Sequence, residues 1–258
     1  MGSPAGSGLV IRCNGSVELA SQRHRLEEAL HERSFLWLDL GDPGTNDLEV
    51  LEQLFAFHPL ALEDSWKFGQ RPKLDAYDDH VFLVLYGGSP DEDRLVEVHC
   101  FLSDRYLVTI HRDEAPSLEA LHERLARRGL TESPVHLLYD VADGLVDSFF
   151  PALAELDDRL DVLGDAILSQ PGDAELAEIF SMKRLLVGVR KVVSPQRDLL
   201  ASISAGVVEV PGMTVEDQRY FRDVYDHLIR ISDLIDTYRD LLTGAMDVHL
   251  SSVSNRLN

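Results

Sequence analysis

The chain has 258 residues, 45% of them hydrophobic, and a formal net charge of −21 from 24 Lys and Arg against 45 Asp and Glu. This length allows one large α/β domain or two smaller units, with enough apolar residues to fill a core. The excess of acids argues against nucleic-acid binding, since phosphate contacts need a basic surface. It favours either a solubility surface or the attraction of cations.

The two cysteines, Cys13 and Cys100, belong to no paired motif, so neither a zinc knuckle nor a disulfide framework is indicated. Residues 1–8 are small and lack the charged and apolar regions of a signal peptide, and we predict a flexible tail there. No window approaches the roughly 18 consecutive apolar residues of a membrane span. We therefore expect this fragment to be soluble.

Six strands are predicted in the α/β domain that we assign to residues 9–132. Short runs rich in apolar, β-branched and aromatic residues are bounded there by turn residues. The strands are expected at residues 9–13, 35–40, 73–77, 81–86, 95–102 and 106–110. Tight links at 78–79 and 103–104 predict hairpin-like pairs among the last four strands.

Helical patterns lie between the strands at residues 19–31, 47–55 and 118–127. Helices that alternate with strands in this way pack on the faces of a sheet. The sequence therefore predicts an α/β fold, with a mixed sheet covered by helices in an α/β/α sandwich. We expect antiparallel as well as parallel neighbours in the sheet.

Three long helices are predicted from residue 133 onward, where the strand patterns stop. They cover about 134–169, 173–205 and 214–258, with Pro-Gly breaks at 171–172 and 211–212. We assign residues 133–212 to a helical hairpin and residues 213–258 to a stalk helix, so that long antiparallel helices follow the sheet.

The ends and bends of these helices have local signals. Asp173 and Thr214 follow the two breaks and are candidate N-caps. Pro151 and Pro195 are expected to kink their helices or to mark helix boundaries.

The last helix carries an apolar seam at alternating steps of three and four, which is typical of a bundle or an oligomer. The seam consists of Phe221, Val224, Leu228, Ile231, Ile235, Tyr238, Leu242 and Ala245. At 1.5 Å per residue the helix would be roughly 65 Å long, so we expect it to leave the domain as a stalk.

A line of acids recurs every seven residues on the polar side of the same helix, at Asp226, Asp233, Asp240 and Asp247. Such a line is normally a solvated face. If several copies of the helix packed around an axis, the line would bring like charges together unless water or a cation intervened.

Two long stretches carry a resemblance to a known family. They are WLDL...LFAFHPLALEDS...QRPKLDAYDDHVFLVLYG, from residue 37, and YFRDVYDHLIRISDLIDTYRDLL...LSSVSNRLN, from residue 220. In order and spacing both closely resemble the cytoplasmic part of CorA-type divalent-cation channels. The resemblance covers nearly the whole chain from the first strands to Asn258.

The resemblance implies a plan for the whole protein. A cytoplasmic α/β domain would lead through the stalk helix to two membrane spans, and a homopentamer would surround a central pore at the cytoplasmic face of the inner membrane. The chain stops where the first span would start, and the family's GMN signature would lie beyond its end. Mg²⁺ or another divalent cation is expected as both the regulatory ligand and the transported ion.

The resemblance also implies metal sites between subunits. Asp64, in HPLALED, is similar to the family acid that binds a regulatory ion, and Asp223, in FRDVYDH, to its partner from the neighbouring subunit. Glu63 and Asp147 are similar to the acids of an adjacent second site, with Asp143 as the fallback for Asp147. Oxygen ligands of this kind suit Mg²⁺, which usually keeps several waters.

One face of the final turns is expected to line the inner pore mouth. It consists of Asp247, which would gather cations, and Leu250, which would constrict, followed by Ser254 and Asn258. His227 lies one turn after Asp223. It is either simply packed or a softer ligand for Co²⁺, Ni²⁺ or Zn²⁺.

The sequence is thus interpreted as the cytoplasmic regulatory domain of a CorA-like channel for Mg²⁺, or for Co²⁺ or Ni²⁺, which senses intracellular metal at subunit interfaces and gates the pore. A zinc transporter of the ZntB kind is the nearest alternative. A soluble coiled-coil scaffold is an alternative of another class, for which the heptad pattern alone would suffice. An enzyme is not expected, because HExxH, GxSxG, P-loop and paired Cys/His motifs are all lacking.

Overall fold

The structure is a computed structural model that describes residues 9–14, 16–32, 35–89, 95–129, 133–169 and 172–257. The predicted tail at residues 1–8 and the final Asn258 lie outside these ranges. Six strands form one sheet, and all six predicted strands are confirmed. They are β1 (Leu9–Asn14), β2 (Leu36–Gly41), β3 (Lys73–Ala76), β4 (Val81–Gly88), β5 (Leu95–Leu102) and β6 (Tyr106–His111).

The strand order is β1-β2-β6-β5-β4-β3, and the sheet is mixed as predicted. β1, β2 and β6 run parallel, whereas β6, β5, β4 and β3 pair antiparallel along the other half. Every residue of β2, β4 and β6 is buried, because helices cover both faces of the sheet. The largest buried side chains of this core include Trp37, Phe82 and Phe101.

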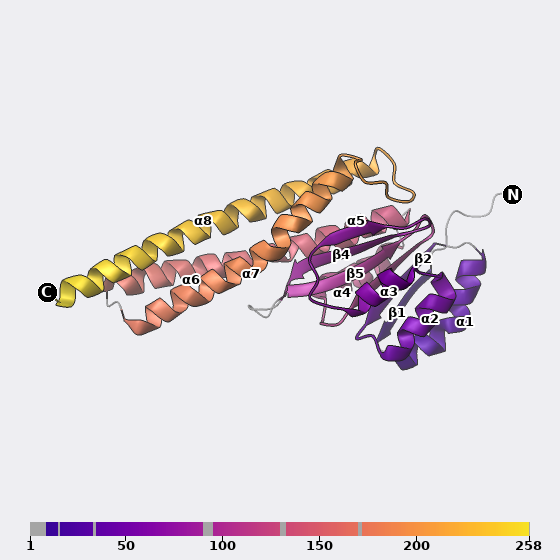
Figure 1. Cartoon of the computed structure of the whole chain (residues 1–258), viewed down its shortest axis with the longest axis horizontal. Helices are drawn as coiled ribbons and strands as arrows, with labels where there is room; N and C mark the ends of the chain where they lie inside the picture. The colour runs from indigo at the N-terminus through magenta and orange to yellow at the C-terminus, as the bar shows by residue number, and fades with distance from the viewer. Residues whose placement is uncertain are drawn as a thin grey trace.

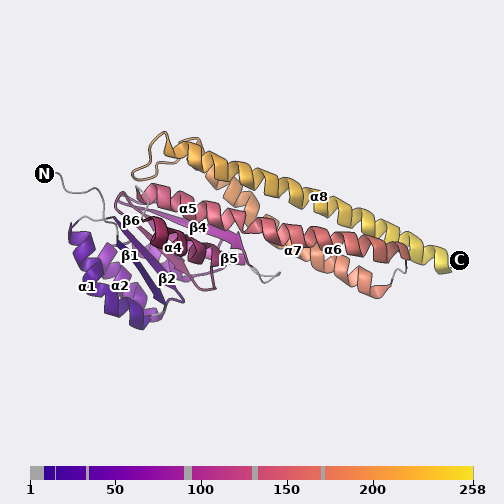
Figure 2. The same ribbon diagram turned by 180° about the vertical axis from the view of Figure 1, so that it is seen from behind.

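Helices cover the two faces of the sheet in separate layers. Figure 1 shows α1 (Ser16–Glu32), α2 (Thr45–Phe55) and α3 (Pro59–Trp66) in front of the strands. Figure 2, from behind, shows α4 (Pro116–Arg128) and α5 (Pro134–Asp147) on the opposite face. The predicted α/β/α sandwich is therefore confirmed.

Helix α3 was not predicted, because eight residues are too few for a periodic pattern. Its start is nevertheless locally encoded. Pro59 occupies the first turn, where its missing N–H costs nothing. The ring Nδ1 of His58 accepts a hydrogen bond from the Leu60 N–H at 3.2 Å and caps the helix.

The predicted single helix over 134–169 is wrong, since the chain breaks at Ser148 into α5 and α6 (Phe149–Ser169). The Ser148 hydroxyl accepts a hydrogen bond from the Gly88 N–H at 2.8 Å and donates one to the Leu145 carbonyl at 2.6 Å. A Cβ at Gly88 would lie 2.5 Å from the Ser148 carbonyl oxygen. A glycine in β4 therefore permits the close approach that fixes this corner.

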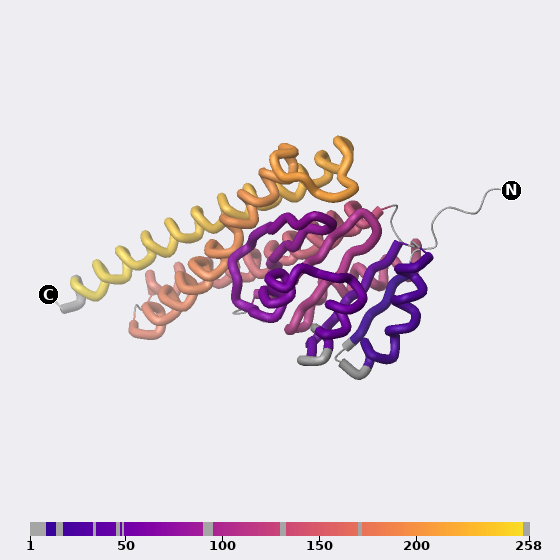
Figure 3. Tube along the Cα trace, turned by 45° about the vertical axis from the view of Figure 1, so that its right-hand side comes forward, coloured from indigo at the N-terminus to yellow at the C-terminus, as the bar shows by residue number. Residues whose placement is uncertain are grey.

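The remaining helices, α7 (Asp173–Ser204) and α8 (Asp217–Leu257), run antiparallel and extend with α6 well beyond the sheet, as Figures 1 and 3 show. The predicted seam of α8 is buried from Phe221 to Leu242, against the other helices of the same chain. β1 and the last turns of α8 lie at opposite ends of the molecule. The long stalk is thus a bundle rather than a bare helix.

The helix starts agree in part with the predicted caps. Asp173 is the first residue of α7 and not its cap, because the Gly172 N–H donates to the Glu175 carboxylate at 2.9 Å. Thr214 does cap α8, since its hydroxyl accepts from the Asp217 N–H at 3.2 Å. Pro151 and Pro195 both lie within helices, α6 and α7. Across the described ranges, no helix is both long and apolar enough to span a bilayer.

Candidate metal centre

Helix α5 places three acids on one face. Asp140, Asp143 and Asp147 are spaced by three and four residues, and such residues share a side of a helix. The opposite side of α5 is apolar and packs on the sheet, through buried residues such as Leu138 and Leu145. Asp143 and Asp147 thereby face α8, while Asp140 pairs with Arg124 of α4 at 2.6 Å.

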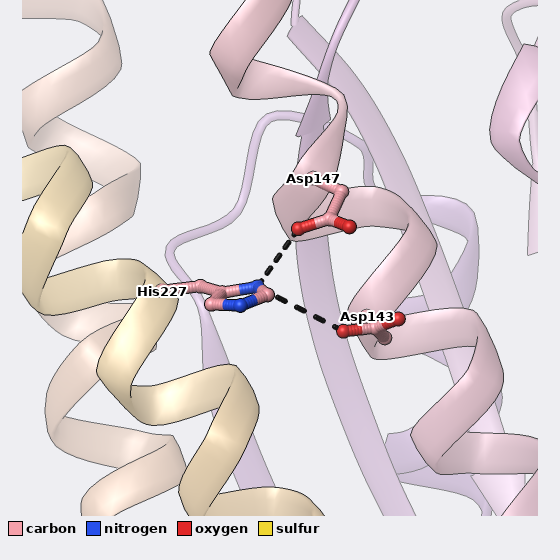
Figure 4. A group of neighbouring side chains, drawn as sticks. All are labelled: Asp143, Asp147 and His227. Carbon is pink, nitrogen blue, oxygen red and sulfur yellow. Dashed lines mark ion pairs between the residues drawn. The ribbon is translucent and has the colours of Figure 1, made fainter.

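Helix α8 brings His227 against these acids, as Figure 4 shows. Its Nδ1 atom lies 2.8 Å from Asp147 Oδ1 and 3.9 Å from Asp143 Oδ1. One ligand atom from each of the three residues lies within 4.8 Å of the other two. We call Asp143, Asp147 and His227 the α5/α8 group.

The α5/α8 group is partly shielded from solvent, with side-chain exposures of 25% for Asp143, 50% for Asp147 and 23% for His227. Burial, followed by the charges of Asp147 and Asp223, raises the pKa of Asp143 from 3.8 to about 6, against the opposing effect of His227. Among the described residues, neither Asp143 nor Asp147 forms an ion pair with a lysine or arginine. The group therefore concentrates negative charge without a permanent cation to balance it.

The Nδ1 atom of His227 is buried and has no hydrogen-bond partner among the described residues, in spite of its 2.8 Å separation from Asp147. The contact is electrostatic, without the direction of a hydrogen bond. Two carboxylates and one imidazole within this distance form a donor set for a divalent cation, with the imidazole suited to Co²⁺, Ni²⁺ or Zn²⁺ and the oxygens to Mg²⁺.

Asp223 lies one turn before His227 on α8 and adjoins the same group. Its side chain is exposed, and its charge helps to raise the pKa values of Asp143 and Tyr139. For Tyr139 burial is the larger cause, and the pKa reaches about 12. Asp223 is thus available both to the α5/α8 group and to a ligand from outside the chain.

Asp64 and Glu63 lie on α3, on the other face of the sheet from α5. Glu63 pairs with Lys67, one turn on, and Asp64 pairs with Lys73 of β3. The structure of one chain therefore does not bring Asp64 to Asp223, or Glu63 to Asp147. The predicted sites between subunits remain predictions.

Lys73 also contacts a second carboxylate, Asp75 Oδ2, at 2.8 Å. Burial lowers the pKa of Lys73, but the hydrogen bonds to Asp64 and Asp75 outweigh it and raise the pKa above its ordinary value. The ammonium group is therefore charged at neutral pH and shared between two acids.

The predicted pore-facing residues lie on an exposed side of α8. Asp247 and Ser254 are exposed, and Leu250 leaves 56% of its surface to solvent. Asn258 lies outside the described residues. The acidic line is exposed along its whole length, at Asp226, Asp233, Asp240 and Asp247. An exposed leucine beside such a line leaves an apolar contact open for another molecule.

Asp39 is a second acid with histidine neighbours, but it is buried and its carboxylate oxygens are already in contact with other side chains. Its carboxylate accepts a hydrogen bond from Thr109 at 2.6 Å, contacts His122 at 2.7 Å, and lies 3.5 Å from His111. Burial alone would raise the pKa of Asp39, but these histidine hydrogen bonds lower it well below its usual value. We interpret this cluster, which the sequence did not indicate, as a structural tie between β2, β6 and α4.

The sequence predicted Asp147 and named Asp143 as its fallback, and the structure places both in one group. It left His227 open between packing and ligation. Residue spacing was the sequence signal that could have indicated this group. Asp143 and Asp147 are four residues apart, and so are Asp223 and His227. Each pair lies on one helix face, but only the packing of α5 against α8 joins them.

Comparison with known proteins gives a consistent picture. Residues 32–258 match the family model described as CorA-like Mg2+ transporter protein. The putative metal ion transporter YfjQ of Bacillus subtilis is 32% identical over 87% of this chain and 70% of its own length. The cobalt/magnesium transport protein CorA of Thermotoga maritima is 34% identical over 86% of this chain and 65% of its own length.

The fold also matches a solved structure. The soluble domain of CorA from Methanocaldococcus jannaschii superposes with a TM-score of 0.73 at 24% identity, over 83% of this chain and 87% of that domain. At this identity the likeness establishes the fold alone. The chain spans about two thirds of the length of the two relatives above, 70% and 65%.

Proposed function

Because the chain belongs to the CorA-like Mg²⁺ transporter family, we propose that it is the ion-sensing part of a divalent-cation transporter. The family is one of transporters and not of enzymes. The proposal depends on one observation above all, the meeting of Asp143, Asp147 and His227 between α5 and the long helix α8. A cation bound there would fix α8 to the sheet domain.

A metal ion bound at the α5/α8 group would stabilise the contact between α5 and α8, because it would remove the repulsion between the carboxylates of Asp143 and Asp147. Two unit charges 4 Å apart interact by about 4 kcal/mol at an effective dielectric near 20, and salt reduces this value at exposed positions. Mg²⁺, or Co²⁺ or Ni²⁺ with the imidazole, would replace that repulsion with attraction. The arrangement with α8 docked on α5 would then be favoured when cytoplasmic metal is abundant, because a ligand shifts the population to the state it binds better.

A second site would join two copies of the chain. Helix α3, which carries Glu63 and Asp64, lies on the other face of the sheet from α5, which carries Asp147 and contacts α8 with its Asp223. These acids would therefore meet between neighbouring copies. We infer a homopentamer at the cytoplasmic face of the inner membrane, with Asp64 of one copy facing Asp223 of the next. Glu63 and Asp147 would supply the adjacent site.

Helix α8 would carry the change to the pore. Its buried seam makes it move with α7, because the seam packs on that helix. In the assembly, Asp247 would form a ring that gathers cations, and the exposed Leu250 would form an apolar constriction, followed by Ser254 and Asn258. The chain would continue beyond α8 into the membrane spans.

Zinc transport is the second candidate. It is favoured by the imidazole of His227 within the α5/α8 group, because Zn²⁺ accepts nitrogen ligands more readily than Mg²⁺ does. Uptake of Mg²⁺, Co²⁺ and Zn²⁺ by cells that express the full-length protein distinguishes the two.

The experiment that tests the sensing role is thermal unfolding of the chain with and without Mg²⁺. A cation that binds only the folded state in roughly tenfold excess over its Kd stabilises it by about 1.4 kcal/mol. For a chain of this size that is a rise in Tm of about 3–6 °C. Asp143→Asn with Asp147→Asn should lose the part of the rise that comes from the α5/α8 group, and the double variant Asp64→Ala with Asp223→Ala should lose the part that comes from the site between copies.

A Mg²⁺ response that is unchanged in this double variant would remove Asp64 and Asp223 from regulation. Sedimentation under the same conditions is the companion measurement. Monomers at every protein concentration, with metal present, would contradict the sites between subunits.

A further inference from the structure

Lys73 lies at the centre of the acids on the α3 side of the sheet. Its ammonium group contacts Asp64 of α3 and, at 2.8 Å, Asp75 of its own strand. It also lies 5.4 Å from the centre of the Phe82 ring. Of these side chains, Lys73 is 30% exposed, Asp64 34% and Asp75 42%. Water and ions therefore reach both carboxylates, while the lysine is held by three neighbours.

The strand and the helix hold the charges in fixed positions. Lys73 and Asp75 are two residues apart in β3, so both side chains point to the same face of the sheet. The strand pairs with the buried β4, where Phe82 is opposite Asp75. On the other side, the Gln70 side chain donates a hydrogen bond to the backbone carbonyl of Asp64 and fixes the end of α3. Only the side chains can exchange partners.

We propose that Lys73 is a tethered cation that occupies the Asp64 carboxylate until a divalent ion displaces it, and so sets the ion concentration at which Asp64 is filled. This rests on the proposed function, in which Asp64 is an ion ligand. The displaced ammonium group does not need to enter solvent, because Asp75 already contacts it. The exchange therefore swaps one cation for another at Asp64 without leaving Lys73 unpaired.

Glu63 and Lys67 form a different kind of pair. They are 56% and 64% exposed, and both lie on or next to the same short helix. Among the described residues, Lys67 forms an ion pair with Glu63 alone, and the charge of Asp64 acts on it without such a contact. Lys67 can move away from Glu63 into solvent, whereas Lys73 stays next to Asp64 after its displacement, because Asp75 still holds it. Lys73 is therefore the residue that sets the threshold.

Removal of the Lys73 charge should make ion binding at Asp64 tighter. A unit charge a few ångströms from a divalent ion changes binding by about tenfold or more even in a water-like dielectric, and salt reduces this effect. Lys73→Met should therefore lower the Mg²⁺ concentration of half-maximal effect about tenfold. Lys73→Arg retains the charge and should leave that concentration within about twofold of the parent.

The test measures the midpoint of Mg²⁺-dependent protection against a protease, in a parent chain that carries Asp143→Asn and Asp147→Asn so that the α5/α8 group does not contribute. Lys73→Met, Lys73→Gln and Lys73→Arg are compared with Lys183→Met, a control on α7 whose lysine donates a hydrogen bond to the Thr243 hydroxyl and, in the part of the chain that the structure describes, pairs with no acid. Circular dichroism without metal identifies any variant that fails to fold. A lysine that merely positions Asp64 would give the opposite shift, towards weaker binding.

Two results overturn the proposal, and they are distinguishable. If Asp64→Ala removes the protection but Lys73→Met and Lys73→Gln leave its midpoint unchanged or raise it, Lys73 is not a competitor and the proposed role of Asp64 stands. If Asp64→Ala itself leaves the midpoint unchanged, Asp64 is not an ion ligand and both ideas fail.

Discussion

The acids on the two faces of the sheet differ in how their charge is balanced. On the α5/α8 side, Asp143 and Asp147 contact the imidazole of His227 and, among the described residues, pair with no lysine or arginine. On the α3 side, Glu63 and Asp64 each pair with a lysine. Lysines therefore balance the carboxylates on the α3 side, but not those on the α5/α8 side.

The difference separates two ways of building a cation site. The α5/α8 group brings two carboxylates and an imidazole together within one chain. The α3 acids already pair with lysines, so under the proposed function ion binding there would require displacement of Lys73 and an acid from another copy. The first site should therefore bind ions in a monomer, whereas the second should bind them only in an assembly.

The largest expected effect is on ion binding by the α5/α8 group. Asp143→Asn combined with Asp147→Asn should weaken Co²⁺ binding at least about 100-fold, because each unit charge in contact with a divalent ion is worth more than about 1.4 kcal/mol at an effective dielectric near 20. Calorimetry at neutral pH, at a protein concentration where sedimentation gives monomers, measures this change.

The matched control is Asp161→Asn with Asp165→Asn, two exposed acids with the same spacing on α6. It should leave Co²⁺ affinity within about threefold of the parent, as should Glu63→Gln with Asp64→Asn. Equal losses in all three double variants would mean that the ion responds to overall charge and not to a site.

The next effect is on stability and has a defined pH dependence. The pKa of Asp143 is raised from 3.8 to about 6 in the folded state. Between these values the folded chain binds more protons than the unfolded chain, so its stability falls as pH rises. The contribution is fully present below pH 3.8 and is lost as pH rises through about 6.

Asp143→Asn should therefore raise the free energy of unfolding at pH 7.5 by about 1–2 kcal/mol, after allowance for the partial exposure of this side chain. Urea unfolding with a chelator, at pH 7.5 and pH 4, measures it, and the gain should shrink at the lower pH. A gain of the same size at both values would assign the effect to packing rather than charge.

Much of the sheet could be predicted because its strands are local patterns. The run from Val81 to Gly88 is apolar and bounded by acids on both sides, which indicates a buried strand without any knowledge of its neighbours. Helix α3 has too few residues for periodicity. The break at Ser148 has a local signal in Pro151, which lies in the first turn of α6. Its position also depends on Gly88, which is 60 residues away in sequence.

The candidate site was predictable as a set of acids but not as a geometry. The resemblance to CorA-type channels indicated Asp64 with Asp223 and Glu63 with Asp147, and it named Asp143 as the fallback for Asp147. Two facts depend on tertiary packing alone. One is that His227 meets Asp147, and the other is that Lys73 occupies Asp64. Ion pairs between distant residues leave no periodic trace in a sequence.

The smallest expected effect is again on stability. On the α3 side, removal of an acid should lower the free energy of unfolding, whereas Asp143→Asn should raise it. Asp64→Asn removes an ion pair whose partners are about one-third exposed, and it should lower the free energy of unfolding by about 0.5–1 kcal/mol in the absence of divalent ions. The value is small because Asp75 still holds Lys73.

Asp75→Asn is the matched variant, since it leaves Lys73 paired with Asp64 and should lower the free energy of unfolding by a similar amount. Urea unfolding in chelator at pH 7.5 measures both. An increase in stability for either variant would mean that repulsion outweighs pairing here as well, and that the two faces of the sheet do not differ in charge balance.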